Sequence, residues 1–175
     1  ELGDYIDEIP KSVNIKFYDL TNTYGAFFKC ILSNLKPNKF KYLFIRIIFN
    51  LKRIFGVGAI SLLKSLFKDL GTYDYAIAYR IGICSEFVAY IVDAKKKISW
   101  WHHGSYDYNQ KQTKTIDQVY DKFDYVVSVS QGCKDMILEN VNISPQKIVV
   151  IPNIIDFEDI QKKSLEKIED NLFDK

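Results

Sequence analysis

Short apolar runs alternate with amphipathic segments across the second half of the chain. The apolar runs are rich in valine, isoleucine and aromatic residues, which is typical of strands, and the segments between them have helical spacing. The predicted strands are 73–79, 97–101, 124–129 and 147–151, and the predicted helices between them are 85–93, with Ser85 as N-cap, 112–122 and 131–140. Continuous apolar strands that alternate with helices predict an α/β fold, a Rossmann-like parallel sheet with helices on both faces.

The pattern before the first of these strands is less regular. Residues 2–9 resemble the end of a helix that Pro10 stops, and residues 13–18 alternate like a strand. Residues 38–55 place apolar side chains at i, i+3, i+4 and i+7, which predicts an amphipathic helix, and a second helix is expected over 59–70. We therefore expect the chain to be a segment that begins within a larger fold.

Composition narrows the class of protein. Hydrophobic residues at 47% and aromatic residues at 15% exclude a disordered chain, and no apolar run reaches the roughly 18–20 residues that a membrane span needs. The three cysteines, Cys30, Cys84 and Cys133, have apolar sequence neighbours, which predicts core thiols rather than disulfides. These features predict a cytoplasmic protein.

The net charge of +2 conceals an asymmetry. Residues 20–68 contain nine basic residues and no acidic one, which leaves about −7 for the rest of the chain. The basic face of the helix over 38–55 could contact anionic lipid, at about 1 kcal/mol for each basic residue, or its charges could simply be solvated while the apolar face packs in the core. We expect core packing for most of the apolar face and peripheral contact with the inner face of the plasma membrane through five residues: Lys39, Lys41, Arg46, Lys52 and Arg53.

The two histidines of the chain follow one predicted strand, in the sequence I-S-W-W-H-H-G-S from Ile98 to Ser105. In open parallel sheets, ligands bind beyond the carboxyl ends of the strands, so both histidines are candidates for a binding site. Neighbouring residues on an extended chain point to opposite sides, so His102 and His103 should not hold one metal ion, and no metal site is predicted.

Three motifs in order carry a resemblance to a known family. They are W-x-H at Trp100 and His102, Y-D-K-F-D-Y-V-V-S-V-S over 120–130, and K-I-V-V-I-P-N-I-I-D over 147–156. Together they resemble the N-terminal, acceptor-side domain of family 4 glycosyltransferases, one half of a GT-B fold. Ile154 stands where glycine is common in the family, which is similar to some bacterial capsule and cell-wall polysaccharide transferases.

The resemblance implies that two domains of the enzyme have different roles. In the family a second domain binds most of the nucleotide-sugar donor, without a metal or a cofactor, and the sugar is transferred with retention. The resemblance covers residues 73–156 and places a first strand before Glu1. We therefore expect residues 1–156 to be a partial Rossmann-like N-terminal domain, residues 157–175 to be a linker helix toward a second domain, and the segment alone to be inactive.

The resemblance also ranks the candidate residues. It implies that His102 lies in the cleft near the acceptor and the transferred sugar, as the catalytic residue, although a histidine that ends a strand can also be a core or capping residue. His103, Gly104 and Ser105 are cleft candidates, and the last two also suit an ordinary turn. Further candidates, which could equally be caps or turn residues, follow the later strands: Ser130, Asn153 and Asp156.

Two alternatives remain open at the level of sequence. Aromatic side chains near the histidine loop could stack on sugar rings or form an ordinary rim: these are Tyr106, Tyr108 and Tyr120. The chain as a whole could be part of a transferase that acts on a glycan or lipid-linked acceptor in polysaccharide biosynthesis, or a stand-alone binding or regulatory domain that uses its basic face. Nucleic acid is not expected as a partner, because the basic run has no interleaved stacking aromatics.

Overall fold

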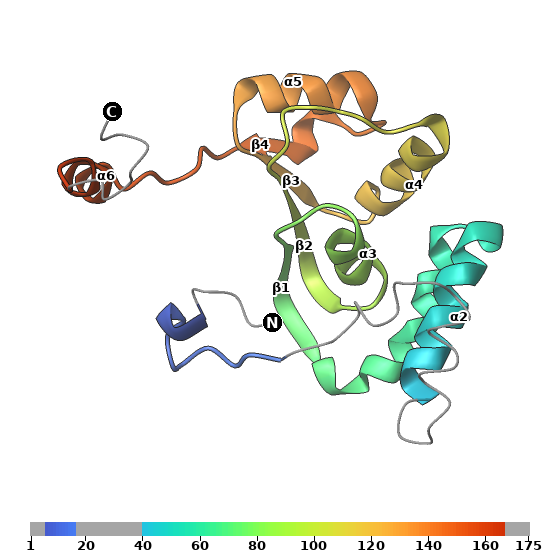
Figure 1. Cartoon of the computed structure of the whole chain (residues 1–175). Helices are drawn as coiled ribbons and strands as arrows, with labels where there is room; N and C mark the ends of the chain where they lie inside the picture. Colours follow the sequence, from blue (N-terminus) through green and yellow to red (C-terminus); the bar gives the residue numbers. More distant parts are fainter. Residues whose placement is uncertain (1–5, 17–39, 167–175) are drawn as a thin grey trace, which may run out of the picture. The chain divides into compact units, whose positions relative to one another are not determined.

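The computed structural model describes residues 6–16 and 40–166 of the chain (Figure 1). The chain divides into two compact units, Glu1–Lys68 and Asp69–Lys175. Each unit is described by itself below, and the second contains the sheet and the candidate site.

The described elements of the first unit are helices. A single 3-10 turn, η1, spans Ile6–Glu8, and the helix α2 spans Phe40–Phe55, as the apolar spacing predicted. Gly56, with a φ of 81°, ends α2, because this left-handed conformation suits glycine. The following segment, η4, spans Val57–Leu70 and is a 3-10 helix with a kink, where the pattern predicted an ordinary helix.

Burial follows the predicted apolar face of α2 only at Ile48, which is buried, whereas four other residues of that face are exposed: Phe44, Ile47, Ile54 and Phe55. Ile45, which the predicted face did not include, is buried. The strand predicted over 13–18 is wrong for residues 13–16, which form no strand, and its last two residues lie outside the described part. Alternation identified an apolar side of this segment, but a strand also needs a hydrogen-bonded neighbour.

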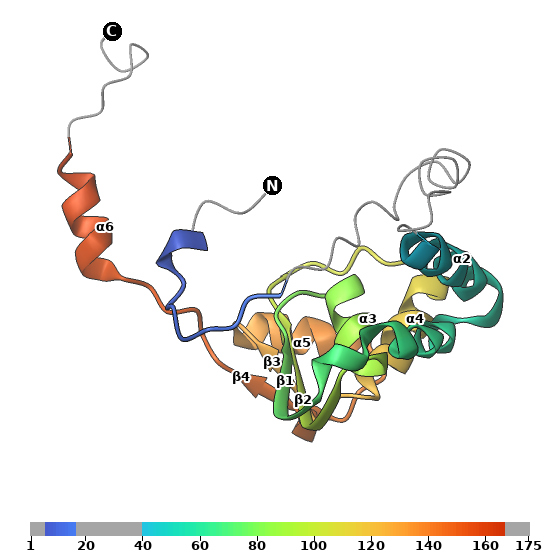
Figure 2. The ribbon, with the colours of Figure 1, turned by 90° about the horizontal axis from the view of Figure 1, so that it is seen from below.

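The second unit is built on four parallel strands in the order β1-β2-β3-β4, which the labels of Figure 1 follow from bottom to top; Figure 2 shows the same sheet from below. The strands are β1 (Thr72–Ala78), β2 (Asp93–Trp101), β3 (Tyr125–Ser128) and β4 (Ile148–Val150), and the helices between them are α3 (Ile83–Tyr90), α4 (Gln110–Tyr120) and α5 (Gln131–Asn140), with the short η5 (Pro145–Lys147) before β4. A parallel sheet needs such crossover connections. The predicted fold class, an α/β Rossmann-like parallel sheet with helices around it, is confirmed.

The two faces of this sheet differ. On one face Ser99 and Trp101 of β2 are fully buried, and side chains of α3 and α4 contact them. On the other face the side chains at the intervening positions of the outer strands, such as Tyr75, Ile77 and Val149, are exposed. Because successive residues of a strand point to opposite faces, each strand contributes to both environments.

A line of buried hydroxyl groups joins α3, β2 and α4 on the covered face. The Ser99 hydroxyl donates to the Tyr120 hydroxyl over 3.3 Å and lies 3.3 Å from Ser85 Oγ, and the Ser85 hydroxyl donates to the Arg80 carbonyl oxygen over 2.9 Å. The prediction that Ser85 is the N-cap of α3 is therefore wrong. The helix starts earlier, after Gly82, whose φ of 83° turns the chain out of β1.

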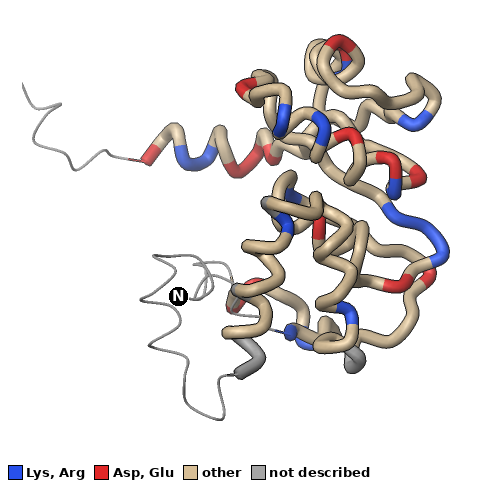
Figure 3. The backbone as a smooth tube through the Cα atoms, turned by 90° about the vertical axis from the view of Figure 1, so that its right-hand side faces the viewer, with Lys and Arg blue, Asp and Glu red and all other residues tan. Residues whose placement is uncertain are grey.

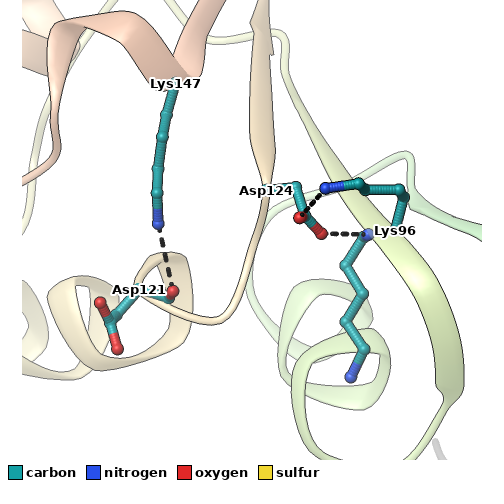
Figure 4. Close-up of polar contacts among 5 residues, drawn as sticks. Lys96, Asp121, Asp124 and Lys147 are labelled. Carbon is teal, nitrogen blue, oxygen red and sulfur yellow. Dashed lines mark hydrogen bonds and ion pairs between the residues drawn. The ribbon is translucent and has the colours of Figure 1, made fainter.

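Polar contacts tie the strands together at their amino-terminal edge (Figure 4). The Asp124 carboxylate, at the start of β3, accepts hydrogen bonds from Lys96 Nζ at 2.7 Å and from the Lys97 backbone N–H at 2.9 Å. Both contacts favour the charged carboxylate, so the Lys96 ammonium first and the Lys97 amide second hold the pKa of Asp124 below its usual value. Lys147 Nζ also donates to the Asp121 carbonyl oxygen, at 3.3 Å.

The last described element, α6, spans Phe157–Ser164 within the predicted linker helix. Asp156 caps its first turn by accepting a hydrogen bond from the Asp159 backbone N–H. Acidic and basic residues follow one another along α6 (Figure 3), and none of its residues is buried. The rest of the predicted linker, residues 167–175, lies outside the described part of the chain.

Candidate functional site

The predicted site residues of the second unit follow the carboxyl ends of three neighbouring strands. His102 to Ser105 follow β2, Ser130 follows β3, and Asn153 and Asp156 follow β4. Because all strands are parallel, these ends lie at the same edge of the sheet (Figure 1), and the register pairs the last residues Trp101, Ser128 and Val150 across it. The edge is the one at which open α/β sheets bind their ligands.

The His102 ring packs in a cluster of three aromatic rings. Its centroid lies 6.4 Å from that of Trp100, with nearly parallel planes, and 4.9 Å from that of Tyr79, which directly follows β1. The Tyr79 and Trp100 centroids are 5.1 Å apart. We call Tyr79, Trp100 and His102 the aromatic triad. The side chain of Tyr79 is 60% exposed, whereas the other two are half-buried.

Two nitrogen atoms of the aromatic triad have no hydrogen-bond partner within the described residues. They are Trp100 Nε1 and His102 Nε2, and both are shielded from solvent. An unpaired buried polar group costs about 1–3 kcal/mol, and native proteins keep few of them. Such atoms at the ligand-binding edge of the sheet are suited to donate to, or accept from, a ligand.

The thiol of Cys133 fixes the backbone on both sides of His102. Cys133 lies in the first turn of α5 and is 2% exposed. Its S–H donates to the His103 carbonyl oxygen at 3.1 Å, and its sulfur lies 3.7 Å from the Trp101 carbonyl oxygen. The predicted core position is confirmed for this cysteine.

The other two cysteines give different outcomes. Cys84 is exposed in the first turn of α3, so the prediction of a core thiol is wrong there. Apolar neighbours in the sequence do not show which side of a helix a residue occupies. Cys30 lies outside the described residues.

Two candidate residues act as helix caps. Ser130 Oγ accepts a hydrogen bond from the Cys133 backbone N–H at 3.1 Å, which caps α5, and Asp156 caps α6 in the same way. Both are exposed, as is Asn153. The capping alternative weighed for Ser130 is thus observed, and Asp156 is a cap where the alternative was a turn. Contact with a substrate stays a prediction for Ser130, Asn153 and Asp156.

The loop after His102 is open. His103, Gly104 and Ser105 are exposed, and a Cβ added at Gly104 would meet no atom within 4 Å. The carbonyl oxygen of His103 is held by Cys133, while its side chain faces away from the buried core. The backbone of this loop is therefore accessible to a ligand.

The tyrosines near the loop divide between surface and core. Tyr106 stacks on Trp101, with centroids 6.3 Å apart, and donates from its hydroxyl to Thr113 Oγ1, while Tyr108 meets Tyr106 edge to face. Tyr120 is only 2% exposed, so the prediction that its ring could stack on a sugar is wrong. Burial removes the phenolate from water and raises the pKa of Tyr120 to about 12.

Sequence reasoning missed Tyr79 and the thiol contact. Tyr79 is one of several tyrosines along β1, and only its place directly after the strand, beside the W-x-H strand, distinguishes it. Cys133 lies 30 residues from His103, and no local pattern announces their contact.

The remaining predictions concern the basic residues near α2, a membrane span and a metal site. Lys41, Arg46, Lys52 and Arg53 belong to α2, and Lys39 lies outside the described residues. Within the described ranges, no helix is long and apolar enough to cross a membrane. In the same part of the chain, no three His, Cys, Asp or Glu side chains gather in a group that could hold a metal ion.

The geometry defines a Rossmann-like α/β domain with a histidine and two aromatic rings at the ligand-binding edge of its sheet. The profile of Glycosyltransferase Family 4 matches residues 37–159, more than half of the chain, so the chain belongs to this family and contains a glycosyltransferase-type domain. The match begins well before residue 73, so it includes α2 and η4, which the resemblance seen in the sequence did not cover. No curated protein and no solved structure matches the chain.

Proposed function

We propose that this chain forms the acceptor-side wall of the cleft in a glycosyltransferase that builds a polysaccharide. The enzyme would transfer a sugar from a nucleotide-sugar donor to a glycan or to a lipid-linked acceptor. The single observation that carries the proposal is the position of His102, directly after the carboxyl end of β2, with a ring nitrogen that finds no partner among the described residues. Membership in the family supplies the general substrates, a sugar and an acceptor.

The imidazole of His102 has the chemistry that this role needs. A neutral imidazole has one nitrogen that donates and one that accepts, so it can bind a sugar hydroxyl or take its proton during transfer. Trp100 and Tyr79 hold the ring by packing, and Cys133 holds the backbone on both sides of it. A side chain positioned by packing loses little freedom when a substrate binds.

Further residues of the cleft are proposed from their place on the same edge. His103, Gly104 and Ser105 would contact the acceptor from the open loop, and Ser130, Asn153 and Asp156 from the ends of the next two strands. The donor would be held mainly by a second domain, without a metal, and transfer would retain the configuration of the sugar. Residues 1–175 alone would then be inactive.

The basic residues of α2 suit an acceptor that is anchored in a membrane. Lys41, Arg46, Lys52 and Arg53 belong to α2, and Lys39 directly precedes it in the sequence; a cytoplasmic enzyme with these five basic residues in one short segment would bind the anionic inner leaflet peripherally. Sedimentation with vesicles of phosphatidylcholine, with and without phosphatidylglycerol, measures this contact. Reversal of the charges of Lys52 and Arg53 should release the protein from the anionic vesicles, and equal binding to both vesicle types would contradict the proposal.

The central experiment replaces His102 in the intact enzyme. Transfer from radiolabelled UDP-glucose, UDP-galactose and UDP-N-acetylglucosamine to acceptors in cell membranes would be compared for the wild type, His102→Ala and His103→Ala. We expect the loss of a general acid or base at residue 102 to lower kcat by about 100-fold or more, and the change at residue 103 to have a smaller effect. Unchanged transfer in His102→Ala would remove this histidine from the site.

A further inference from the structure

The most exposed member of the aromatic triad lies outside the three sequence motifs that resemble the family. Tyr79 directly follows β1, and its ring lies about 5 Å from both Trp100 and His102, with centroid separations of 5.1 and 4.9 Å. Its side chain is 60% exposed, so a large part of an aromatic ring faces solvent next to the candidate catalytic histidine. Aromatic side chains present an apolar face that can pack against other apolar surfaces.

Two polar atoms of the other members of the triad indicate the kind of ligand. Trp100 Nε1 and His102 Nε2 are buried without a partner within the described residues, so the site has an apolar face together with unused hydrogen-bonding capacity. An entirely apolar ligand would leave both atoms unpaired, and a bare anion would gain nothing from the tyrosine ring. A sugar ring combines an apolar C–H face with hydroxyl groups at its edge, and therefore matches both features.

We propose that the aromatic triad is a stacking subsite for one sugar ring of the acceptor, with Tyr79 as its contact surface. The ring would pack its C–H face on Tyr79, and its hydroxyl groups would pair with Trp100 Nε1 and His102 Nε2. Because both nitrogen atoms are shielded from solvent in the free protein, this pairing requires neighbouring side chains to move when the sugar binds. The subsite rests on the acceptor-side role proposed above.

The strand itself provides a matched control. Tyr73 lies on β1, six residues before Tyr79 and on the same face of the sheet, and its side chain is 41% exposed. It lies at the amino end of the strand, away from His102. If sugars bound to any exposed tyrosine, Tyr73 and Tyr79 would contribute equally to binding. If the aromatic triad forms the subsite, only Tyr79 should contribute.

Binding can be measured on the full chain by saturation-transfer difference NMR. The probes are the methyl β-glycosides of glucose, galactose and N-acetylglucosamine, at up to about 50 mM, a range suited to weak binding. We expect saturation on the ring C–H protons of at least one probe. Tyr79→Ala should lower it by about fivefold, Tyr79→Phe should keep it, and Tyr73→Ala should leave it unchanged.

The outcomes separate this inference from the proposed function. Absence of saturation for all three probes, or equal loss in Tyr79→Ala and Tyr73→Ala, would overturn the subsite. Circular dichroism checks that each variant is folded, and Trp100→Phe, which keeps a ring but removes the Nε1 donor, should lose part of the signal. Sugar binding through Tyr79 without any transfer by the intact enzyme would overturn the proposed function and leave the triad as a sugar-binding site without an acceptor role.

Discussion

Trp100 and Trp101 are neighbours on β2 that lie in opposite environments. Trp101 is completely buried on the covered face, where Tyr106 stacks on it and Tyr120 packs against it. Trp100 is half-buried and packs with Tyr79 and His102 at the open edge. One strand thus supplies a core residue and a candidate site residue at successive positions. Because Trp101 is fixed in the core, the backbone of the adjacent Trp100 is held in place as well.

The comparison predicts unequal effects of two like substitutions. Trp101→Ala should lower the free energy of unfolding by about 3–5 kcal/mol, because it leaves a cavity in the core, and Trp100→Ala should lower it by less than half as much. Urea unfolding followed by circular dichroism measures both, since the signal does not depend on either tryptophan. Equal losses would show that the two faces are not different in packing.

The covered face can also be tested by pH. Tyr120 has a raised pKa of about 12, so at high pH the unfolded chain ionises this group near pH 10 while the folded chain still keeps the proton. Stability should therefore fall as pH rises from about 10 to about 12, by up to about 3 kcal/mol from this group. Tyr120→Phe should lack this pH-dependent part of the stability. The free energy of unfolding of both proteins can be measured at about pH 9 and about pH 11.5, and it should fall less between the two pH values in the variant than in the wild type. Parallel losses would contradict the assignment.

Cys133 connects the two environments, because it contacts the backbone of Trp101 and of His103. Cys133→Ala should cost about 1 kcal/mol and leave the His103 carbonyl oxygen without its donor, whereas Cys133→Ser keeps a donor. The imidazole NMR signals of His102 and His103, the two histidines of the chain, should move in the alanine variant and stay close to the wild type in the serine variant. Identical spectra for the two variants would show that the thiol contact does not hold the loop.

The smallest effect is expected at the amino-terminal edge, away from both tryptophans. The contacts of Asp124 lower its pKa, so its contribution is present above the ordinary value of 3.8 and is lost as pH falls through the lowered pKa. Asp124→Asn should cost about 1 kcal/mol or less at neutral pH, because the ion pair is partly exposed, and should flatten the loss of stability in acid. Asp121→Asn, whose exposed carboxylate makes only a long ion pair with Lys122, is the matched control. Equal acid profiles would contradict the role of Asp124.

Much of the second unit was predictable from local pattern. The helix over 131–140 has the bounds predicted for it, the four strands were found within a few residues, and their alternation with helices implied parallel pairing. Parallel pairing in turn places His102, Ser130 and Asn153, each of which follows a strand, at one edge of the sheet. These features depend on periodicity and on connection length, which neighbouring residues determine.

Other features depend on contacts between distant segments. The alternation along β2 places Trp100 and Trp101 on opposite faces, but which face α3 and α4 would cover was decided only when those helices packed on the sheet. The same packing buries Tyr120 and Ser85, which the sequence offered as a surface ring and a helix cap, and leaves Cys84 exposed. It also brings Cys133 to His103 and Tyr79 to His102.

The sequence by itself determined the class of fold and the edge of the sheet at which the candidate residues lie, because both follow from the order and spacing of strands along the chain; the resemblance to a family singled out His102, and its role stays a prediction. Only the tertiary structure decided what surrounds that histidine: a tyrosine that follows the neighbouring strand, a thiol that contacts the adjacent backbone, and two ring nitrogen atoms without a partner among the described residues. Burial and hydrogen bonding are properties of three-dimensional neighbourhoods, and residues 20 to 30 positions apart become neighbours only when the helices and strands have packed.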